Sequence, residues 1–311
     1  MATSETSPSI APSRFKLSLK TLRRVGVGAA IFYGVYAASV WALHRSIVFP
    51  APRSGLEPSV ARAKLLRLDP TRSASGAVPR DPTDEELTGA GTVVALWAAP
   101  SPGRPTIVFF HGNGEELVDL GPLAQFLMDL GVGVYFVEYP GYGLARDGKS
   151  TEASIYAAAA RALDELPALG VTKERTILVG HSLGTGVAVE MAVRGYGAKL
   201  VLVSPFTSMV DMVSRFTPLI PTSWVVRDRF DNLEKAPRIP IDTLIVHGDQ
   251  DTLVPIAMAR ALESATPRSE LVIFSGGGHN DLFRREGHRL PRMIANLLGG
   301  TPSGERTRAT R

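Results

Sequence analysis

The order of apolar and polar positions predicts strands that alternate with helices between residues 91 and 298. Short apolar runs typical of buried strands occupy residues 92–98, 106–110, 132–137, 176–179, 199–203, 243–246 and 270–274. Longer segments with helical character occupy residues 117–130, 151–166, 185–193, 256–265 and 286–298. Because continuous apolar strands separated by helices are typical of a parallel sheet covered on both faces, the pattern predicts an α/β fold.

Residues 208–240 interrupt this alternation, with Pro218, Pro221 and Trp224 among mixed charges. The interruption predicts a short cap over the sheet, within a domain that spans residues 91–298. The other parts are predicted to be less regular. They are a basic, partly disordered tail at 1–24, a linker with an irregular lead into the domain at 44–90, and a disordered tail at 299–311.

An uncharged apolar segment at residues 25–43 predicts a single transmembrane anchor. Its nineteen residues, at about 1.5 Å each, form a helix of roughly 28 Å, close to the thickness of the hydrocarbon core. Basic residues before the segment indicate a cytoplasmic N-terminus and a C-terminal domain on the exported, periplasmic or lumenal side. A signal peptide cleaved near Ala42 and a core helix of a soluble domain remain as alternatives.

The composition narrows the chemistry that the chain can support. The 311 residues include no cysteine, which excludes disulfides, thiolate metal sites and cysteine nucleophiles. The net charge is +4, but much of the basic excess lies near the chain ends without a nucleic-acid motif, so we expect no nucleic-acid partner. Gly114-Glu115-Glu116 lacks the Gly-Lys-Ser/Thr of a phosphate loop, and no metal-ligand cluster is visible. We therefore predict neither a cofactor nor a metal.

The pentapeptide Gly180-His181-Ser182-Leu183-Gly184 lies between a predicted strand and a predicted helix. A G-x-S-x-G sequence in this context is typical of a nucleophile elbow, in which a strained turn projects a serine hydroxyl from the edge of the sheet. The flanking glycines are needed because strand and helix approach closely there. We predict that Ser182 is a catalytic nucleophile.

A serine hydroxyl needs an adjacent base, and the base needs an orienting acid. Two later strands end in loops that carry candidates, Asp251 after the first and His279 after the second. Both loops are expected at the carboxyl edge of the sheet, in the order Ser, Asp, His. Asp249 competes as the acid, and Asp251 could instead cap the following helix. His288 competes as the base but falls in a predicted surface helix.

The same mechanism requires backbone N–H donors for the oxyanion. We predict that Leu183 provides one and that Asn113, in the loop His111-Gly112-Asn113-Gly114, provides the other without needing its side chain. Asn-Gly is also a common turn signal, so an ordinary turn remains the alternative. Three more histidines adjoin glycines at strand ends and are predicted to organise loops rather than to transfer protons: His111, His181 and His247.

These motifs occur in one order along residues 90–298. The set comprises Phe109-Phe110-His111-Gly112-Asn113-Gly114, Glu138-Tyr139-Pro140-Gly141-Tyr142-Gly143, Gly180-His181-Ser182-Leu183-Gly184, Ser204-Pro205-Phe206-Thr207-Ser208, His247-Gly248 through Pro255, and Gly278-His279-Asn280. Together they resemble the α/β-hydrolase superfamily, in particular its membrane-anchored branch of bud-emergence-like hydrolases and protein depalmitoylases. The resemblance implies an eight-stranded, mostly parallel sheet and a triad of Ser182, His279 and Asp251. It also places Tyr142 and Gly143 in a loop that borders the site.

The chain departs from this branch in two respects. The Asp-Gly hairpin common between its first strands is absent, and so is the cysteine cluster that is palmitoylated in eukaryotic depalmitoylases. The second departure weakens any transfer of protein substrates to this chain.

The predicted function is that of a membrane-anchored serine hydrolase that cleaves carboxylic ester or thioester bonds through an acyl-enzyme on Ser182. Two alternatives remain: a peptidase of the proline-iminopeptidase type, and a catalytically silent fold that acts as an interaction module. The short cap, with Met209, Met212, Phe216 and Trp224, suggests a lipid-like acyl substrate, although these residues could merely pack on the sheet. A substrate pocket is predicted from Tyr142, Met209, Met212 and Phe216. The sequence indicates neither the physiological substrate nor the oligomeric state.

Overall fold

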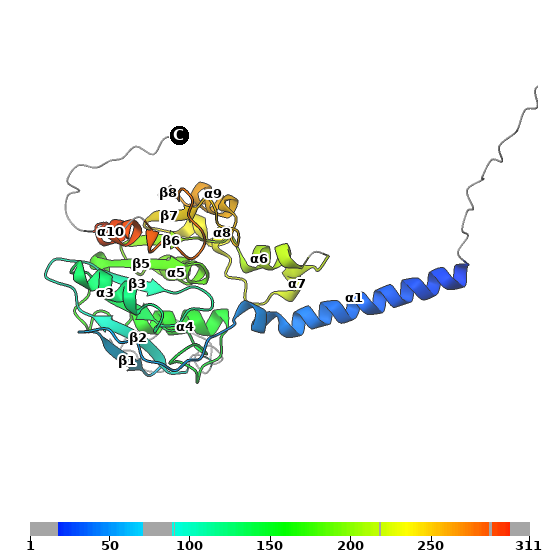
Figure 1. The fold of residues 1–311 in the computed structure, drawn as a ribbon, viewed down its shortest axis with the longest axis horizontal. Helices are drawn as coiled ribbons and strands as arrows, with labels where there is room; N and C mark the ends of the chain where they lie inside the picture. The colour runs from blue at the N-terminus through cyan, green and yellow to red at the C-terminus, as the bar shows by residue number, and fades with distance from the viewer. Residues whose placement is uncertain (1–17, 71–88, 90, 218, 286–287, 299–311) are drawn as a thin grey trace, which may run out of the picture. The chain divides into compact units, whose positions relative to one another are not determined.

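The computed structural model describes residues 18–70, 89, 91–217, 219–285 and 288–298, and the chain forms two compact units, Met1–Leu43 and His44–Arg311. The second unit is built on an eight-stranded sheet (Figure 1). Its strands are β1 Lys64–Leu68, β2 Val93–Ala98, β3 Thr106–Phe110, β4 Gly133–Val137, β5 Thr176–His181, β6 Lys199–Val203, β7 Asp242–Gly248 and β8 Ser269–Phe274.

The strands lie in the order β1-β2-β4-β3-β5-β6-β7-β8. β2 runs antiparallel to both of its neighbours, β1 and β4, and the remaining adjacent pairs are parallel. The predicted eight-stranded, mostly parallel α/β fold is therefore confirmed. In this arrangement the loops after β3, β5, β7 and β8 leave the sheet at one edge, where α/β folds bind their ligands.

Strand β1 lies where the sequence indicated only a linker and an irregular lead into the domain. It pairs with β2 along its whole length, from Lys64 opposite Trp97 to Leu68 opposite Val93. Two of its five residues, Lys64 and Arg67, are charged and exposed, as expected at the edge of a sheet. An edge strand of this kind lacks the continuous apolar run by which the buried strands are recognised. Residues 71–88 of the same stretch lie outside the described part of the chain.

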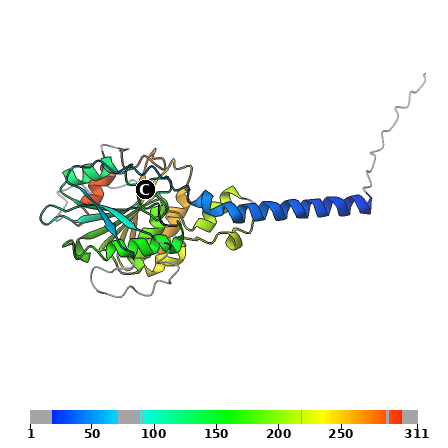
Figure 2. The ribbon, with the colours of Figure 1, turned by 90° about the horizontal axis from the view of Figure 1, so that it is seen from below.

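Helices cover both faces of the sheet, as the alternating pattern predicts (Figure 2). One face packs against α4 Glu152–Leu163, α5 Leu183–Val193 and α9 Ile256–Ala265, and the other packs against α3 Gly121–Asp129 and α10 Arg289–Ala295. Three of these helices are shorter than expected. Turns replace the predicted first residues of α3 and the predicted last residues of α4. The Leu120 N–H donates to the Leu117 carbonyl oxygen ahead of α3, and the Leu166 N–H donates to the Leu163 carbonyl oxygen after α4. Residues 286–287, at the predicted start of α10, lie outside the described part of the chain.

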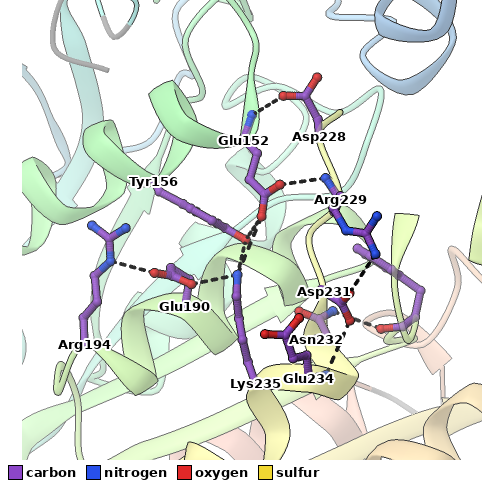
Figure 3. Close-up of polar contacts among 11 residues, drawn as sticks. Glu152, Tyr156, Glu190, Arg194, Asp228, Arg229, Asp231, Asn232, Glu234 and Lys235 are labelled. Atoms are coloured by element: carbon purple, nitrogen blue, oxygen red, sulfur yellow. Dashed lines mark hydrogen bonds and ion pairs between the residues drawn. The ribbon is translucent and has the colours of Figure 1, made fainter. Parts of the chain in front are cut away.

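The cap comprises three short helices, α6 Met209–Phe216, α7 Thr222–Val225 and α8 Asn232–Lys235, followed by the 3-10 turn Ala236–Arg238. Polar contacts join its last part to the helices beneath (Figure 3). The Lys235 ammonium lies 2.7 Å from Glu190 Oε2 on α5 and 2.9 Å from the Tyr156 hydroxyl on α4. Glu152, at the start of α4, accepts the backbone N–H of Arg229 at 2.6 Å. The end of the cap is thus fastened to α4 and α5.

Helix α1 runs from Leu19 to Val48. It begins earlier than the predicted segment at 25–43, so residues 19–24, predicted within the basic tail, are helical. Its first 25 residues, Leu19–Leu43, contain an 18-residue window with a mean hydropathy of 1.5, so this segment is long and apolar enough to cross a membrane. Length and composition alone support this possibility, and a signal sequence near an N-terminus passes the same test.

Candidate active site

Ser182 occupies a sharp turn between β5 and α5. Its backbone dihedrals are φ 49° and ψ −114°, which a residue with a side chain rarely adopts. A Cβ atom on Gly180 would collide with the backbone of Gly184, and one on Gly184 would collide with the carbonyl oxygen of Phe110 at the end of β3. The glycines of the pentapeptide are therefore required by close backbone contacts, as predicted. They bring the turn directly against the loop that follows β3.

The structure brings Ser182, His279 and Asp251 together. His279 Nε2 lies 2.9 Å from Ser182 Oγ, and His279 Nδ1 lies 2.7 Å from Asp251 Oδ2. The other carboxylate oxygen of Asp251 accepts the backbone N–H groups of Leu253 and Val254 at 2.9 and 2.8 Å. Burial raises the pKa of Asp251, but the bonds from His279 and Val254 outweigh it and hold the pKa below its ordinary value. An ionised Asp251 can therefore orient the His279 ring.

The competing residues have other partners. Asp249 Oδ1 accepts the backbone N–H of Gly276 at 2.6 Å, so this carboxylate braces the loop after β8. His288 precedes α10 and stacks on Phe126, with ring centroids 4.3 Å apart. His247, which is predicted to organise a loop and is not a competitor, is buried, and its Nε2 lies 2.9 Å from the carbonyl oxygen of Val254 and 3.4 Å from Asp251 Oδ2.

Asn113 and Leu183 lie on two loops that meet at the elbow. In the described part of the chain, neither backbone N–H donates a hydrogen bond. The side chain of Asn113, however, has two partners that no signal in the sequence identifies. Its Nδ2 donates to the Val48 carbonyl oxygen at 2.7 Å, and its Oδ1 accepts the Tyr142 hydroxyl at 2.8 Å.

Two histidine–glutamate pairs support these loops. His111 Nε2 lies 3.0 Å from Glu138 Oε1, and its Nδ1 lies 2.9 Å from the Gly112 carbonyl oxygen. Both side chains are fully buried. Burial alone would lower the pKa of His111, but the bond and charge of Glu138 raise it above the ordinary value. The pair fixes the first residues of the loop that contains Asn113.

The second pair joins the elbow to the same loop. His181 Nδ1 lies 3.2 Å from Glu115 Oε2, which also accepts the Gly112 N–H at 2.6 Å. His181 Nε2 lies 3.2 Å from the His279 carbonyl oxygen. Since both ring nitrogens face acceptors, only the doubly protonated ring satisfies both contacts. Burial lowers the pKa of His181, but the bond and charge of Glu115 raise it overall. The same contact holds the pKa of Glu115 at about 2, against the effect of its own burial.

The residues of the predicted pocket lie in different environments. Tyr142 is fully buried, while Met209 and Met212 are half-buried and pack against the main core. Phe216, at the end of α6, is 64% exposed. Among the described residues, no group of three or more His, Asp or Glu side chains could hold a metal ion.

The chain matches family models along most of the sheet-and-cap region. Residues 107–236 match a model described as the alpha/beta hydrolase family, and residues 210–286 match one described as the alpha/beta hydrolase fold. A Mycobacterium tuberculosis relative, uncharacterized protein Rv2307c, is 30% identical over 293 residues, which is 92% of this chain and 98% of that protein. Human alpha/beta hydrolase domain-containing protein 17B is 33% identical to this chain. The alignment covers 66% of this chain and 72% of the human protein. The chain belongs to the alpha/beta hydrolase family, which confirms the family indicated by the sequence motifs.

This chain spans a smaller share of other relatives. The chain spans 53% of the alpha/beta hydrolase domain-containing protein aho-3 of Caenorhabditis elegans, at 37% identity over 57% of this chain. It spans 64% of protein 17C of Xenopus tropicalis. Among solved structures, a monoacylglycerol lipase from Paleococcus ferrophilus aligns with a TM-score of 0.51 and 24% identity, over 66% of this chain and 97% of its own. A membrane phospholipase A aligns with a TM-score of 0.54 and 17% identity, and the alignment covers 91% of this chain and 98% of that protein. These two structures share the fold.

Proposed function

We propose that this chain is a serine hydrolase that cleaves carboxylic ester or thioester bonds through an acyl-enzyme on Ser182. One observation carries the proposal: His279 lies between the Ser182 hydroxyl, at 2.9 Å, and the Asp251 carboxylate, at 2.7 Å. This is the relation of nucleophile, base and orienting acid that acyl transfer requires.

The reaction proceeds in two halves. As Ser182 Oγ attacks the carbonyl carbon, His279 Nε2 takes the hydroxyl proton and then gives it to the departing alcohol or thiol. Water attacks the resulting acyl-enzyme, and His279 takes a proton from this water and returns it to Ser182 as the acid leaves. Asp251 accepts the Nδ1–H of His279 throughout and stabilises the charged ring. The N–H groups of Asn113 and Leu183 donate to the oxyanion in each tetrahedral intermediate.

The direct test is the replacement Ser182→Ala in the full-length protein. Turnover of a p-nitrophenyl ester should fall by about a thousand-fold or more, and labelling by a fluorophosphonate probe should disappear. Ser101→Ala, at an exposed position between β2 and β3, is the matched control and should retain both. Unchanged turnover in Ser182→Ala would overturn the nucleophile assignment. A wild-type protein that the probe fails to label would instead favour a catalytically silent fold.

The peptidase alternative loses its main support. It depends on cap carboxylates that could bind a substrate amine, and three aspartates of the cap have partners within the protein. Asp211 accepts the Thr207 hydroxyl, Asp228 pairs with Arg45, and Asp231 accepts the Glu234 N–H. We therefore retain the ester or thioester proposal.

We further propose that α1 anchors the enzyme in a membrane, with the second unit on the exported side. The apolar composition of Leu19–Leu43 and the basic residues that precede the predicted span support this topology. Protease added outside intact cells or spheroplasts should digest the hydrolase domain. Protection in intact cells, together with digestion after lysis, would contradict the exported orientation.

The substrate proposal is a lipid-like acyl group, with Met209, Met212 and Phe216 of the cap near the acyl chain. The apolar character of these cap residues supports it. Turnover of p-nitrophenyl esters of increasing chain length should rise from acetate toward longer chains. A steady decline from acetate onward would exclude this preference.

A further inference from the structure

The last turn of α1 and the residues that follow it contact the cap and the proposed oxyanion loop. We call residues 45–54 the neck. At its start, Arg45 Nε pairs with the buried carboxylate of Asp228 at 3.0 Å. Phe49 is buried, and its ring lies edge-on against Phe230, with centroids 6.1 Å apart. The first half of the neck is thus packed on the segment that joins α7 to α8.

The second half of the neck binds the loop that contains Tyr142. The Pro52 carbonyl oxygen accepts the Gly143 N–H at 2.8 Å, and Arg53 Nε donates to the Gly141 carbonyl oxygen at 3.2 Å. Between these two halves, the Val48 carbonyl oxygen accepts Asn113 Nδ2 at 2.7 Å. The Tyr142 hydroxyl, held in the same region, donates to Asn113 Oδ1 at 2.8 Å. Both ends of the Asn113 amide are therefore engaged.

We propose that the neck is a positioning element of the oxyanion hole and that it acts through the side chain of Asn113. This inference rests on the proposed function, in which the Asn113 N–H donates to the oxyanion. Asn113 is flanked by Gly112 and Gly114, and glycines restrict a backbone little. Gly114 has a φ of +80°. The bonds of the Asn113 side chain restrict the rotation of this peptide, so that its N–H is aimed before substrate arrives. Preorganised donors of this kind contribute most to stabilising the transition state.

The test separates the side chain of Asn113 from its backbone. Asn113→Ala retains the N–H but loses both side-chain bonds, so we expect kcat to fall by about ten- to a hundred-fold while KM changes little. A trifluoromethyl ketone, which forms a tetrahedral adduct with an oxyanion, should bind more weakly by a similar factor. Tyr142→Phe loses one of the two bonds and should give a smaller change in the same direction. Gln125→Ala, on the surface of α3, is the control and should match the wild type.

A variant outside the loop tests the neck itself. Arg45→Gln removes the ion pair with Asp228 but touches neither Asn113 nor the triad. Thermal unfolding of each full-length variant in detergent identifies those that fold, and kinetics are compared only among these. If Arg45→Gln lowers kcat and weakens the binding of the trifluoromethyl ketone while KM stays unchanged, the neck positions the oxyanion hole.

Ser182→Ala distinguishes a failure of the proposed function from a failure of the positioning role alone. If this variant keeps its activity, the proposed function fails, and the inference about the neck fails with it. If Ser182→Ala is inactive while folded Asn113→Ala and Tyr142→Phe retain wild-type kcat and ketone affinity, the neck is only a tether and the positioning role is wrong.

Discussion

The Nε2 atom of His181 lies 3.2 Å from the carbonyl oxygen of His279, so the residue before the proposed nucleophile holds the backbone of the proposed base. On its other side, His181 contacts Glu115, which also accepts the Gly112 N–H of the proposed oxyanion loop. One charged pair therefore connects the loops that carry the proposed nucleophile, the proposed base and a proposed oxyanion donor. The arrangement makes the site sensitive to the protonation of a residue that does not itself transfer a proton.

We predict that Glu115 controls the activity of the enzyme at high pH. The raised pKa of His181 means that its stabilising contribution is fully present below the ordinary pKa of about 6.5 and is lost as the pH rises through the folded-state value. In Glu115→Gln the attraction is removed and burial remains, so the pKa of His181 should fall. The basic decline of kcat/KM should then begin at a lower pH than in the wild type.

The measurement is a pH profile of kcat/KM together with NMR titration of the His181 ring. Other groups that act on this ring are the charge of Asp251, the His279 ring 5.5 Å away and the edge of Phe283. These remain in Glu115→Gln, so a change can be assigned to Glu115. Identical profiles and an unmoved His181 titration would refute the role of the pair. On the acid side, the stability from Glu115 is present above its ordinary pKa and is lost as the pH falls toward about 2.

The two aspartates of the loop after β7 should differ sharply in their effect on catalysis. Asp251→Asn removes the carboxylate that orients His279, so kcat should fall by about a thousand-fold or more. Asp249→Asn leaves that contact intact and weakens only the bonds from the Gly276 N–H and the Ser275 hydroxyl, so kcat should fall less than about ten-fold. Steady-state kinetics of both purified variants give the comparison. Equal losses, or a greater loss in Asp249→Asn, would reverse the assignment of the acid.

Gly184→Ala should prevent correct folding of the elbow. The new Cβ would collide with the carbonyl oxygen of Phe110, and neither backbone can move easily. We expect a loss of more than about 3 kcal/mol in the free energy of unfolding, or no soluble protein. Gly170→Ala is the matched control, since its φ of +77° is strained but nothing lies within 4 Å. That control should cost only about 1 kcal/mol in denaturant unfolding, and similar losses in both would contradict the close-contact explanation.

Lys235→Met should loosen the cap from α4 and α5. The variant leaves Glu190 and the Tyr156 hydroxyl without the ammonium between them. Lys235 and Glu190, which form the ion pair, are both largely buried. We expect a loss of about 2 kcal/mol in the free energy of unfolding. Lys199→Met breaks the more exposed pair with Asp242 and should cost less than about 1 kcal/mol. Chemical denaturation compares the two, and an equal cost would show that the buried network contributes nothing special.

Local patterns were sufficient to predict most of the sheet and the elbow. The strand before Ser182, the turn and the helix after it are adjacent in the sequence, so their signals coincide. β1 was missed because it is a short edge strand with charged residues at Lys64 and Arg67. The earlier start of α1 was missed because its first turns contain Lys20, Arg23 and Arg24, which the composition assigned to a tail.

The long-range contacts of the site could not be predicted in the same way. Asn113 and Val48 are 65 residues apart, and the partner is a backbone carbonyl that any residue type would supply. Glu115 and His181 are 66 residues apart and become neighbours only when β3 and β5 pair. Residue type and order in the sequence are enough to propose the reactive groups, whereas the residues that hold them depend on how the loops meet.

The most direct test of the account is to trap the acyl-enzyme. The full-length protein is mixed with a p-nitrophenyl ester, quenched in acid within the first turnover, digested and analysed by mass spectrometry. The account predicts an added acyl mass on the peptide that contains Ser182 and none in Ser182→Ala. An acyl adduct on another residue, or turnover in the wild type that persists undiminished in Ser182→Ala, would contradict it.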